Sequence, residues 1–105
     1  MIEIGGDTQS TDGTEPSYQH YRGEPPRCGR GYEAWLAQEA IKRNPQVSIY
    51  ALSWGVPGWV GNGSTSQDKI GTSYCTQDNI EYQTGLVSCM KSEFGIETSF
   101  LGVWK

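Results

Sequence analysis

Segments with short apolar runs and segments with helical periodicity follow one another along this chain. The pattern predicts five elements of secondary structure. Short apolar runs rich in β-forming residues predict strands at 2–4, 47–53 and 98–104. Between them, apolar residues recur every three or four positions over 31–44 and 78–93, which predicts two amphipathic helices. Strands that alternate with helices in this way favour an α/β fold with parallel strands and right-handed helical crossovers.

The two predicted helices have recognisable ends. Lys42 and Arg43 suit the carboxyl end of the first helix, where the helix dipole favours cations, and Pro45 stops it. Thr76 or Asp78 can cap the second helix, and a glycine follows its last apolar residue. The predicted apolar faces are Tyr32, Trp35, Leu36, Ala40 and Ile41 in the first helix, and Ile80, Leu86, Val87, Met90 and Phe94 in the second.

Two long segments without periodicity, 7–30 and 55–77, each follow a predicted strand and precede a predicted helix. In a parallel sheet such loops lie at the carboxyl edge of the strands, where α/β folds place their sites. Trp54 lies just before the second loop and Trp59 within it, among glycines and prolines. A tryptophan there either packs beneath the loop or forms the wall of a binding site. Packing is the favoured role of Trp59.

Acidic residues in these segments do not form a recognisable catalytic pair. Asp7, Asp12 and Glu15 lie in the first loop, and nothing in their spacing fixes the separation that a catalytic pair of carboxylates requires. Hydrogen bonding within turns is the favoured interpretation. The remaining candidates, Glu81, Glu93 and Glu97, lie on or beside the second helix and are predicted to be solvated surface residues.

Composition narrows the class of protein further. The 105 residues suffice for one small domain, and the net charge of −4 with scattered cations argues against a nucleic-acid partner. No apolar run approaches the roughly 20 residues of a transmembrane helix. The chain opens directly on a predicted strand, with no signal peptide before it.

The cysteines and the single histidine, His20, offer too few well-spaced ligands for a zinc site. A disulfide would most plausibly join Cys75 to Cys28 or to Cys89, leaving one cysteine unpaired. Three ordinary thiols are the favoured interpretation. Asn62 begins a glycosylation sequon on a predicted surface loop.

Four segments together resemble the galactocerebrosidases of glycoside hydrolase family 59. They are EIGGDTQSTDGTEPS, RGYEAWLAQEAIKRNP, LSWGVPGW and FLGVW, and the resemblance extends over nearly the whole chain. The resemblance implies that residues 1–105 are an N-terminal fragment of a (β/α)8 TIM barrel, with about three parallel strands and two helices. The first three segments are the most specific.

The resemblance also implies an activity. Enzymes of this family hydrolyse the β-galactosyl bond of galactosylceramide and related sphingolipids with retention, through an acid/base glutamate and a nucleophilic glutamate. It implies a glycolipid substrate, a lysosomal location, room for a saposin-like activator protein, and no cofactor or metal. The alternative is a short product that binds galactose without hydrolysis, or a truncated gene model without function.

Two positions carry over as substrate contacts. Thr11 and Trp54 match the family's galactose-contacting threonine and tryptophan. A hydroxyl can exchange hydrogen bonds with a sugar, and an indole offers an apolar wall and one N–H donor. The chain departs from the family at Lys105, where an asparagine and then the acid/base glutamate are expected, so no catalytic residue is predicted within it. Ser53 also replaces a proline, and Cys28 is not part of the family pattern.

Overall fold

The computed structural model describes residues 1–7, 15–60 and 75–103. Its elements in chain order are β1 (Ile2–Ile4), α1 (Glu33–Arg43), β2 (Ile49–Ser53), α3 (Gln77–Phe94) and β3 (Thr98–Gly102). Each predicted strand and helix is therefore present, with ends that differ by at most a few residues. No helix among these residues has the length and apolar character needed to cross a membrane.

The three strands form one parallel sheet in the order β1-β2-β3. Ile4 pairs with Ser53 at the carboxyl end of the first ladder, and Leu52 pairs with Gly102 at the end of the second. The predicted α/β fold with three parallel strands and two helices is confirmed, and it is consistent with a segment of a (β/α)8 barrel.

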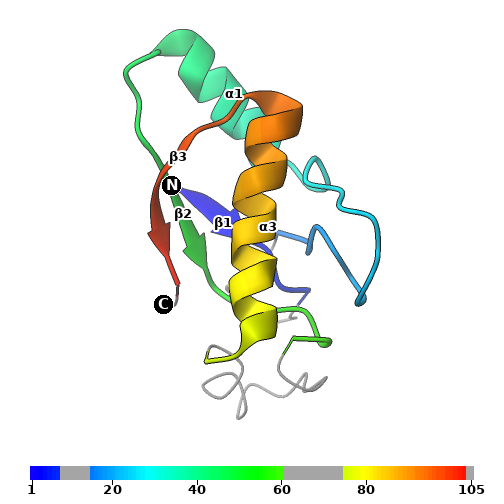
Figure 1. Ribbon diagram of the computed structural model, residues 1–105. Helices are drawn as coiled ribbons and strands as arrows, with labels where there is room; N and C mark the ends of the chain where they lie inside the picture. The colour runs from blue at the N-terminus through cyan, green and yellow to red at the C-terminus, as the bar shows by residue number, and fades with distance from the viewer. Residues whose placement is uncertain (8–14, 61–74, 104–105) are drawn as a thin grey trace.

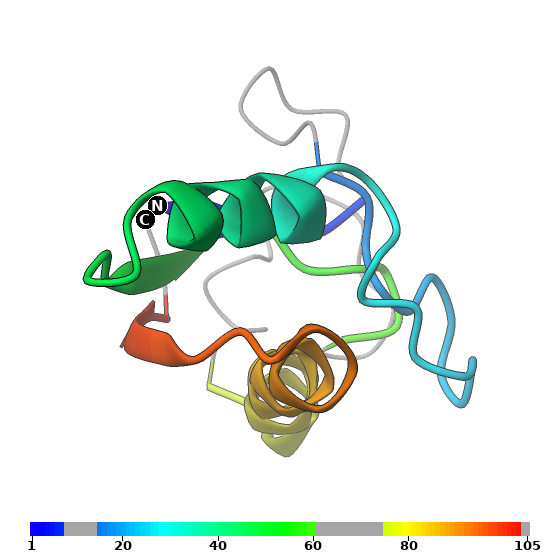
Figure 2. The same ribbon diagram turned by 90° about the horizontal axis from the view of Figure 1, so that it is seen from above.

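The core lies between the sheet and the two helices. In Figure 1, α3 stands upright in front of the strands. In Figure 2, which is seen from above, α3 is nearly end-on and α1 runs across the picture. The helices therefore cross steeply. The buried apolar side chains that fill this space include Ile2, Ile4, Ile49, Ala51, Ala34, Ala37, Tyr82, Leu86, Met90 and Ile96.

The predicted apolar face of α1 is wrong in part. Ala34 and Ala37 are the buried residues of this helix, whereas Trp35 is 62% exposed and Leu36 is 45% exposed. Tyr32, just before the helix, is also exposed. The periodicity was compatible with more than one face, and the small alanine side chains are the ones that allow the helix to approach the core closely.

Helix α3 has the predicted caps. The Thr76 side chain accepts a hydrogen bond from the backbone N–H of Asn79, and Gly95 ends the helix in the left-handed conformation at φ 65°. Its predicted apolar face is correct at Leu86 and Met90 but wrong at Ile80, which is 56% exposed. The fully buried Tyr82 takes the central position instead and was not part of the predicted face.

The predicted cysteine chemistry is corrected by the structure. A disulfide joins Cys28 to Cys89, with the two Cα atoms 6.0 Å apart, and Cys75 is the free, exposed thiol. Neither the favoured interpretation of three thiols nor a bridge to Cys75 is right. The spacing along the chain gave no sign that the first long loop packs against α3, which brings residues 61 positions apart into bonding distance.

Candidate functional site

The carboxyl ends of β1 and β2 meet in a backbone contact that only glycine permits. A Cβ atom added to Gly6 would lie 2.4 Å from the carbonyl carbon of Gly55 and 2.5 Å from the nitrogen of Val56. Because both neighbours are backbone atoms, neither can move aside cheaply. The first residues beyond each strand are therefore held side by side.

Trp54 lies in this contact region, between the last residue of β2 and Gly55. Its side chain is half-buried. Ser53, fully buried, donates a hydrogen bond from its hydroxyl to the Gly55 carbonyl oxygen at 3.1 Å and fixes the turn around Trp54. The structure thus places Trp54 at the predicted edge of the sheet. The second predicted contact, Thr11, lies outside the described residues, as does Lys105.

Trp59 ties the two long loops to α3. Its indole N–H donates to the carbonyl oxygen of Gln19 at 3.0 Å, and its ring meets the ring of Tyr82 edge-on at 5.6 Å. The Arg22 guanidinium lies 5.2 Å from the Trp59 ring centroid and pairs with Asp78 in the first turn of α3. The packing role predicted for Trp59 is consistent with these contacts.

Tyr82 of α3 holds the first long loop through hydrogen bonds and ring stacking. Its buried hydroxyl donates to the carbonyl oxygen of Gly5 and lies 2.7 Å from the Ser17 hydroxyl. Tyr18 stacks on it at 4.8 Å and donates from its own hydroxyl to the Tyr82 carbonyl oxygen at 2.9 Å. Burial raises the pKa of Tyr18 to about 12, so both phenols stay protonated donors at any physiological pH.

Asp7 begins the first loop in a strained conformation. Its φ of 57° lies in the left-handed region, which aspartate tolerates better than most residues. One carboxylate oxygen accepts from the backbone N–H of Ser17 at 2.7 Å, and the other lies 2.7 Å from Nδ1 of His20. This ion pair is at the carboxyl edge of β1, the same edge that carries Trp54.

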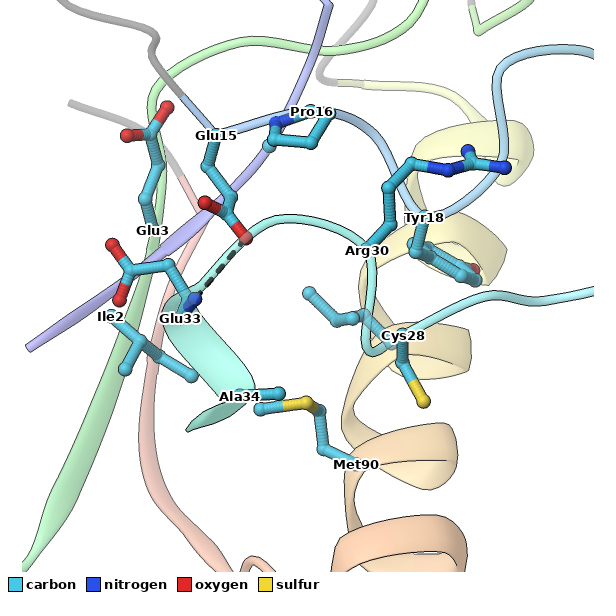
Figure 3. Close-up of a pocket in the computed structure, with 12 residues that line it drawn as sticks. Ile2, Glu3, Glu15, Pro16, Tyr18, Cys28, Arg30, Glu33, Ala34 and Met90 are labelled. Atoms are coloured by element: carbon cyan, nitrogen blue, oxygen red, sulfur yellow. Dashed lines mark hydrogen bonds between the residues drawn. The ribbon is translucent and has the colours of Figure 1, made fainter. Parts of the chain in front are cut away.

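Glu15 caps α1 from the first loop. It is buried, and its two carboxylate oxygens accept long hydrogen bonds from the backbone N–H groups of Tyr32 and Glu33, at 3.5 and 3.4 Å. Figure 3 shows its carboxylate beside Glu33 at the helix start. Gly31 adopts φ +80°, and a Cβ atom there would lie 2.1 Å from a Glu15 carboxylate oxygen. A glycine is therefore required beside this cap.

A narrow cavity of about 20 Å³ opens beside this cap, lined by Glu15, Glu33, Glu3, Arg30 and other residues (Figure 3). Its size suits about one water molecule, not a sugar. Burial raises the pKa of Glu15, opposed by its backbone hydrogen bonds, and burial also raises the pKa of Glu33. One oxygen of Glu33 is buried without a hydrogen-bond partner among the described residues.

These raised pKa values predict that Glu15 and Glu33 contribute more to stability in mild acid than at neutral pH. The folded state binds protons to Glu15 and Glu33 more readily than the unfolded chain does, so the free energy of unfolding increases as the pH falls from neutral through the raised folded pKa values. The gain is complete below the ordinary glutamate pKa. We expect Glu15→Gln to flatten this dependence in urea unfolding curves measured at several pH values. A Glu97→Gln control, at an exposed position, should keep the wild-type slope, and an equal slope in both variants would contradict the expectation.

The remaining acidic residues of the described segments have structural partners or face solvent. Glu24 forms an ion pair with Arg30 at 2.6 Å, and the Arg30 hydrogen bond holds the pKa of Glu24 below its usual range. Glu81, Glu93 and Glu97 are exposed. Among the described residues, one group of three potential metal ligands comes together, Cys28, Cys89 and Glu93. Its two sulfurs are bonded to each other and are not thiolate ligands.

Sequence reasoning missed the Asp7–His20 pair and the role of Glu15 as a helix cap. A signal for the cap was present, because Glu15 lies in a loop that must return to the start of the next helix, whose first N–H groups need acceptors. No comparable signal marked His20, since its partner is 13 residues away in an irregular loop.

Parallel α/β architecture with aromatic and polar side chains at the carboxyl edge of the strands is typical of sugar-cleaving enzymes and of many other classes. Comparison with known families narrows this choice. The model of glycosyl hydrolase family 59 matches residues 1–105. The chain belongs to glycosyl hydrolase family 59.

Individual relatives agree with this assignment. A galactocerebrosidase of zebrafish, Danio rerio, is 39% identical over 103 residues, which is 98% of this chain and 15% of that protein. The galactocerebrosidases of Atlantic salmon, Salmo salar, and of human are 56% and 55% identical over 62 residues, which is 59% of this chain and 9% of each protein. The chain thus spans 15% or less of the length of these relatives.

Proposed function

We propose that this chain forms part of a retaining β-galactosidase acting on galactosylceramide and related sphingolipids, and that its strand ends line the galactose site. The observation that carries the proposal is the placement of Trp54 at the carboxyl edge of β2, half-buried beside the glycine contact between the two strand ends. Family membership and the galactocerebrosidase relatives support the substrate class.

Within that enzyme, the segment contributes binding and no catalytic acid. Asp7 is committed to His20 and Ser17, and Glu15 to the start of α1, so neither carboxylate is free to act on a glycosidic bond. Trp54 and Thr11 are the proposed galactose contacts. The indole of Trp54 provides the apolar wall for the C–H face of the sugar, and the Thr11 hydroxyl exchanges hydrogen bonds with its hydroxyl groups.

The proposal also includes a lysosomal location and a saposin-like activator protein. They follow from the galactocerebrosidase relatives and their lipid substrate. The second candidate function, galactose binding without hydrolysis, uses the same edge and the same tryptophan.

The test is calorimetric titration of the chain with methyl β-galactoside. We expect binding that Trp54→Ala weakens by roughly tenfold, because the substitution removes the apolar surface that the sugar buries on binding. Trp35→Ala is the matched control, since Trp35 is 62% exposed on α1 and takes no part in the proposed site. Equal losses in both variants, or no heat with the wild-type chain, would contradict the proposed function.

Turnover by a full-length relative tests whether Trp54 contacts the substrate or only supports the fold. Substituting alanine at the position equivalent to Trp54 in a full-length galactocerebrosidase should lower galactosylceramide turnover more than it lowers the thermal midpoint. A fall in both by the same proportion would return Trp54 to a purely structural role.

A further inference from the structure

More contacts hold the Asp7–His20 pair in place than an exposed pair of side chains needs. Asp7 takes a left-handed φ of 57° to reach its partner, and it is held by the Ser17 N–H as well. The backbone N–H of His20 donates to Glu24, whose carboxylate is in turn fixed by Arg30. A non-glycine residue in this region of φ and ψ costs free energy, and such strain is concentrated at functional sites.

The pair also leaves one nitrogen of the imidazole unused. A carboxylate can only accept, so the 2.7 Å contact to Asp7 places a proton on Nδ1 of His20. Within residues 1–7, 15–60 and 75–103, no hydrogen bond joins Nε2, although the side chain is 45% exposed. The ring is therefore oriented, with a polar atom free to meet a ligand.

The position of the pair relates it to Trp54. Ile4 and Ser53 are paired in the sheet, and Gly6 touches Gly55 two residues farther along each chain. Asp7 follows the first of these glycines directly, and Trp54 precedes the second. Asp7 and Trp54 therefore lie within two register positions of each other at one edge of the sheet.

We propose that His20 is a further sugar-contacting residue of this edge, binding a galactose hydroxyl through Nε2, and that Asp7 is its positioning residue. This proposal rests on the galactose-binding function proposed above. A sugar hydroxyl both donates and accepts, so it can pair with Nε2 as the acceptor of a neutral imidazole or as the donor of a charged one.

The exposed Arg22–Asp78 pair differs from the Asp7–His20 pair. Arg22 is also exposed, but its guanidinium is engaged by Asp78, by the ring of Trp59 and by the Trp59 carbonyl oxygen. Those contacts join the two long loops to α3, and this structural role explains the placement of Arg22. The contacts of His20 instead orient a ring whose second nitrogen they leave unengaged.

The test uses the fact that His20 is the single histidine of the chain. In a chain labelled with ¹⁵N in histidine and tryptophan, each nitrogen of the imidazole gives a signal that belongs to this residue alone. We expect the Nε2 signal to shift on titration with methyl β-galactoside, and to saturate at the same ligand concentration as the indole signal of Trp54. Asp7→Asn should change the ¹⁵N shifts that report the tautomer of His20, and should weaken binding less than loss of the ring does.

Affinity provides the second measurement. We expect His20→Gln to weaken binding about tenfold, the value of one hydrogen bond, while Lys91→Gln on the far end of α3 leaves it unchanged. A Trp54 signal that titrates while Nε2 stays fixed, or a His20→Gln variant that binds as tightly as wild type, overturns the proposal for His20 alone. If neither signal moves, the proposed galactose site itself is wrong. Should the variant not fold, the wild-type titration still decides the question.

Discussion

Removing the Cys28–Cys89 disulfide is expected to cost this protein about 4 kcal/mol of unfolding free energy. The bridge closes a loop of 61 residues, and the entropy that such a loop withdraws from the unfolded chain corresponds to a stabilisation of that size. A domain of this length has about 5–15 kcal/mol in total, so the double variant Cys28→Ser/Cys89→Ser should lose a large part of its stability. Both positions are buried, so the new hydroxyls add a further cost.

Urea unfolding followed by tryptophan fluorescence measures this effect. Cys75→Ser is the matched control, because Cys75 is free and exposed and its loss should leave the midpoint unchanged. Adding a reductant to the wild-type chain should reproduce the double variant. Identical midpoints for oxidised and reduced wild type would show that the bridge does not stabilise the fold.

Truncation of Tyr82 is the second large effect, with an expected loss of about 3–5 kcal/mol for Tyr82→Ala. Tyr82 is fully buried and supports the rings of Tyr18 and Trp59. Its removal leaves a cavity where α3 meets both long loops. Tyr82→Phe keeps the ring but deprives the Gly5 carbonyl and the Ser17 hydroxyl of their partner, and should cost about 1–3 kcal/mol.

Thermal unfolding of the two variants separates ring packing from hydrogen bonding. Tyr21→Phe is the control, since Tyr21 is 61% exposed and its variant should unfold at the wild-type temperature. The order of stability should be wild type, then Tyr82→Phe, then Tyr82→Ala. A Tyr82→Phe variant as stable as the wild type would show that the hydroxyl network contributes nothing.

The order and type of the elements were predictable because they depend on local signals. Thr76 and Gly95 mark the ends of α3 by side-chain capping and left-handed φ, and both act within a few residues. The edge that carries Trp54 was predictable for a different reason, since parallel strands with helical crossovers leave their loops at one edge.

The predictions failed where contacts span the sequence. Whether Trp35 or Ala34 faces the core depends on how closely α1 packs, which the helical period alone does not determine. The Cys28 partner depends on the path of the irregular loop between β1 and α1, and so does the meeting of Asp7 with His20. Such contacts arise from the folded packing of several segments, and none has a repeating pattern in the sequence.

The disulfide has one more consequence, which concerns the covalent connectivity of the molecule. It joins the loop after β1 to the middle of α3, so the chain between Cys28 and Cys89, including α1 and β2, lies inside a closed covalent ring. A protease that cuts one peptide bond in that ring produces two polypeptides that stay linked through sulfur. The strand that opens the sheet and the strand that closes it therefore remain in one molecule after such a cut, and only reduction separates them.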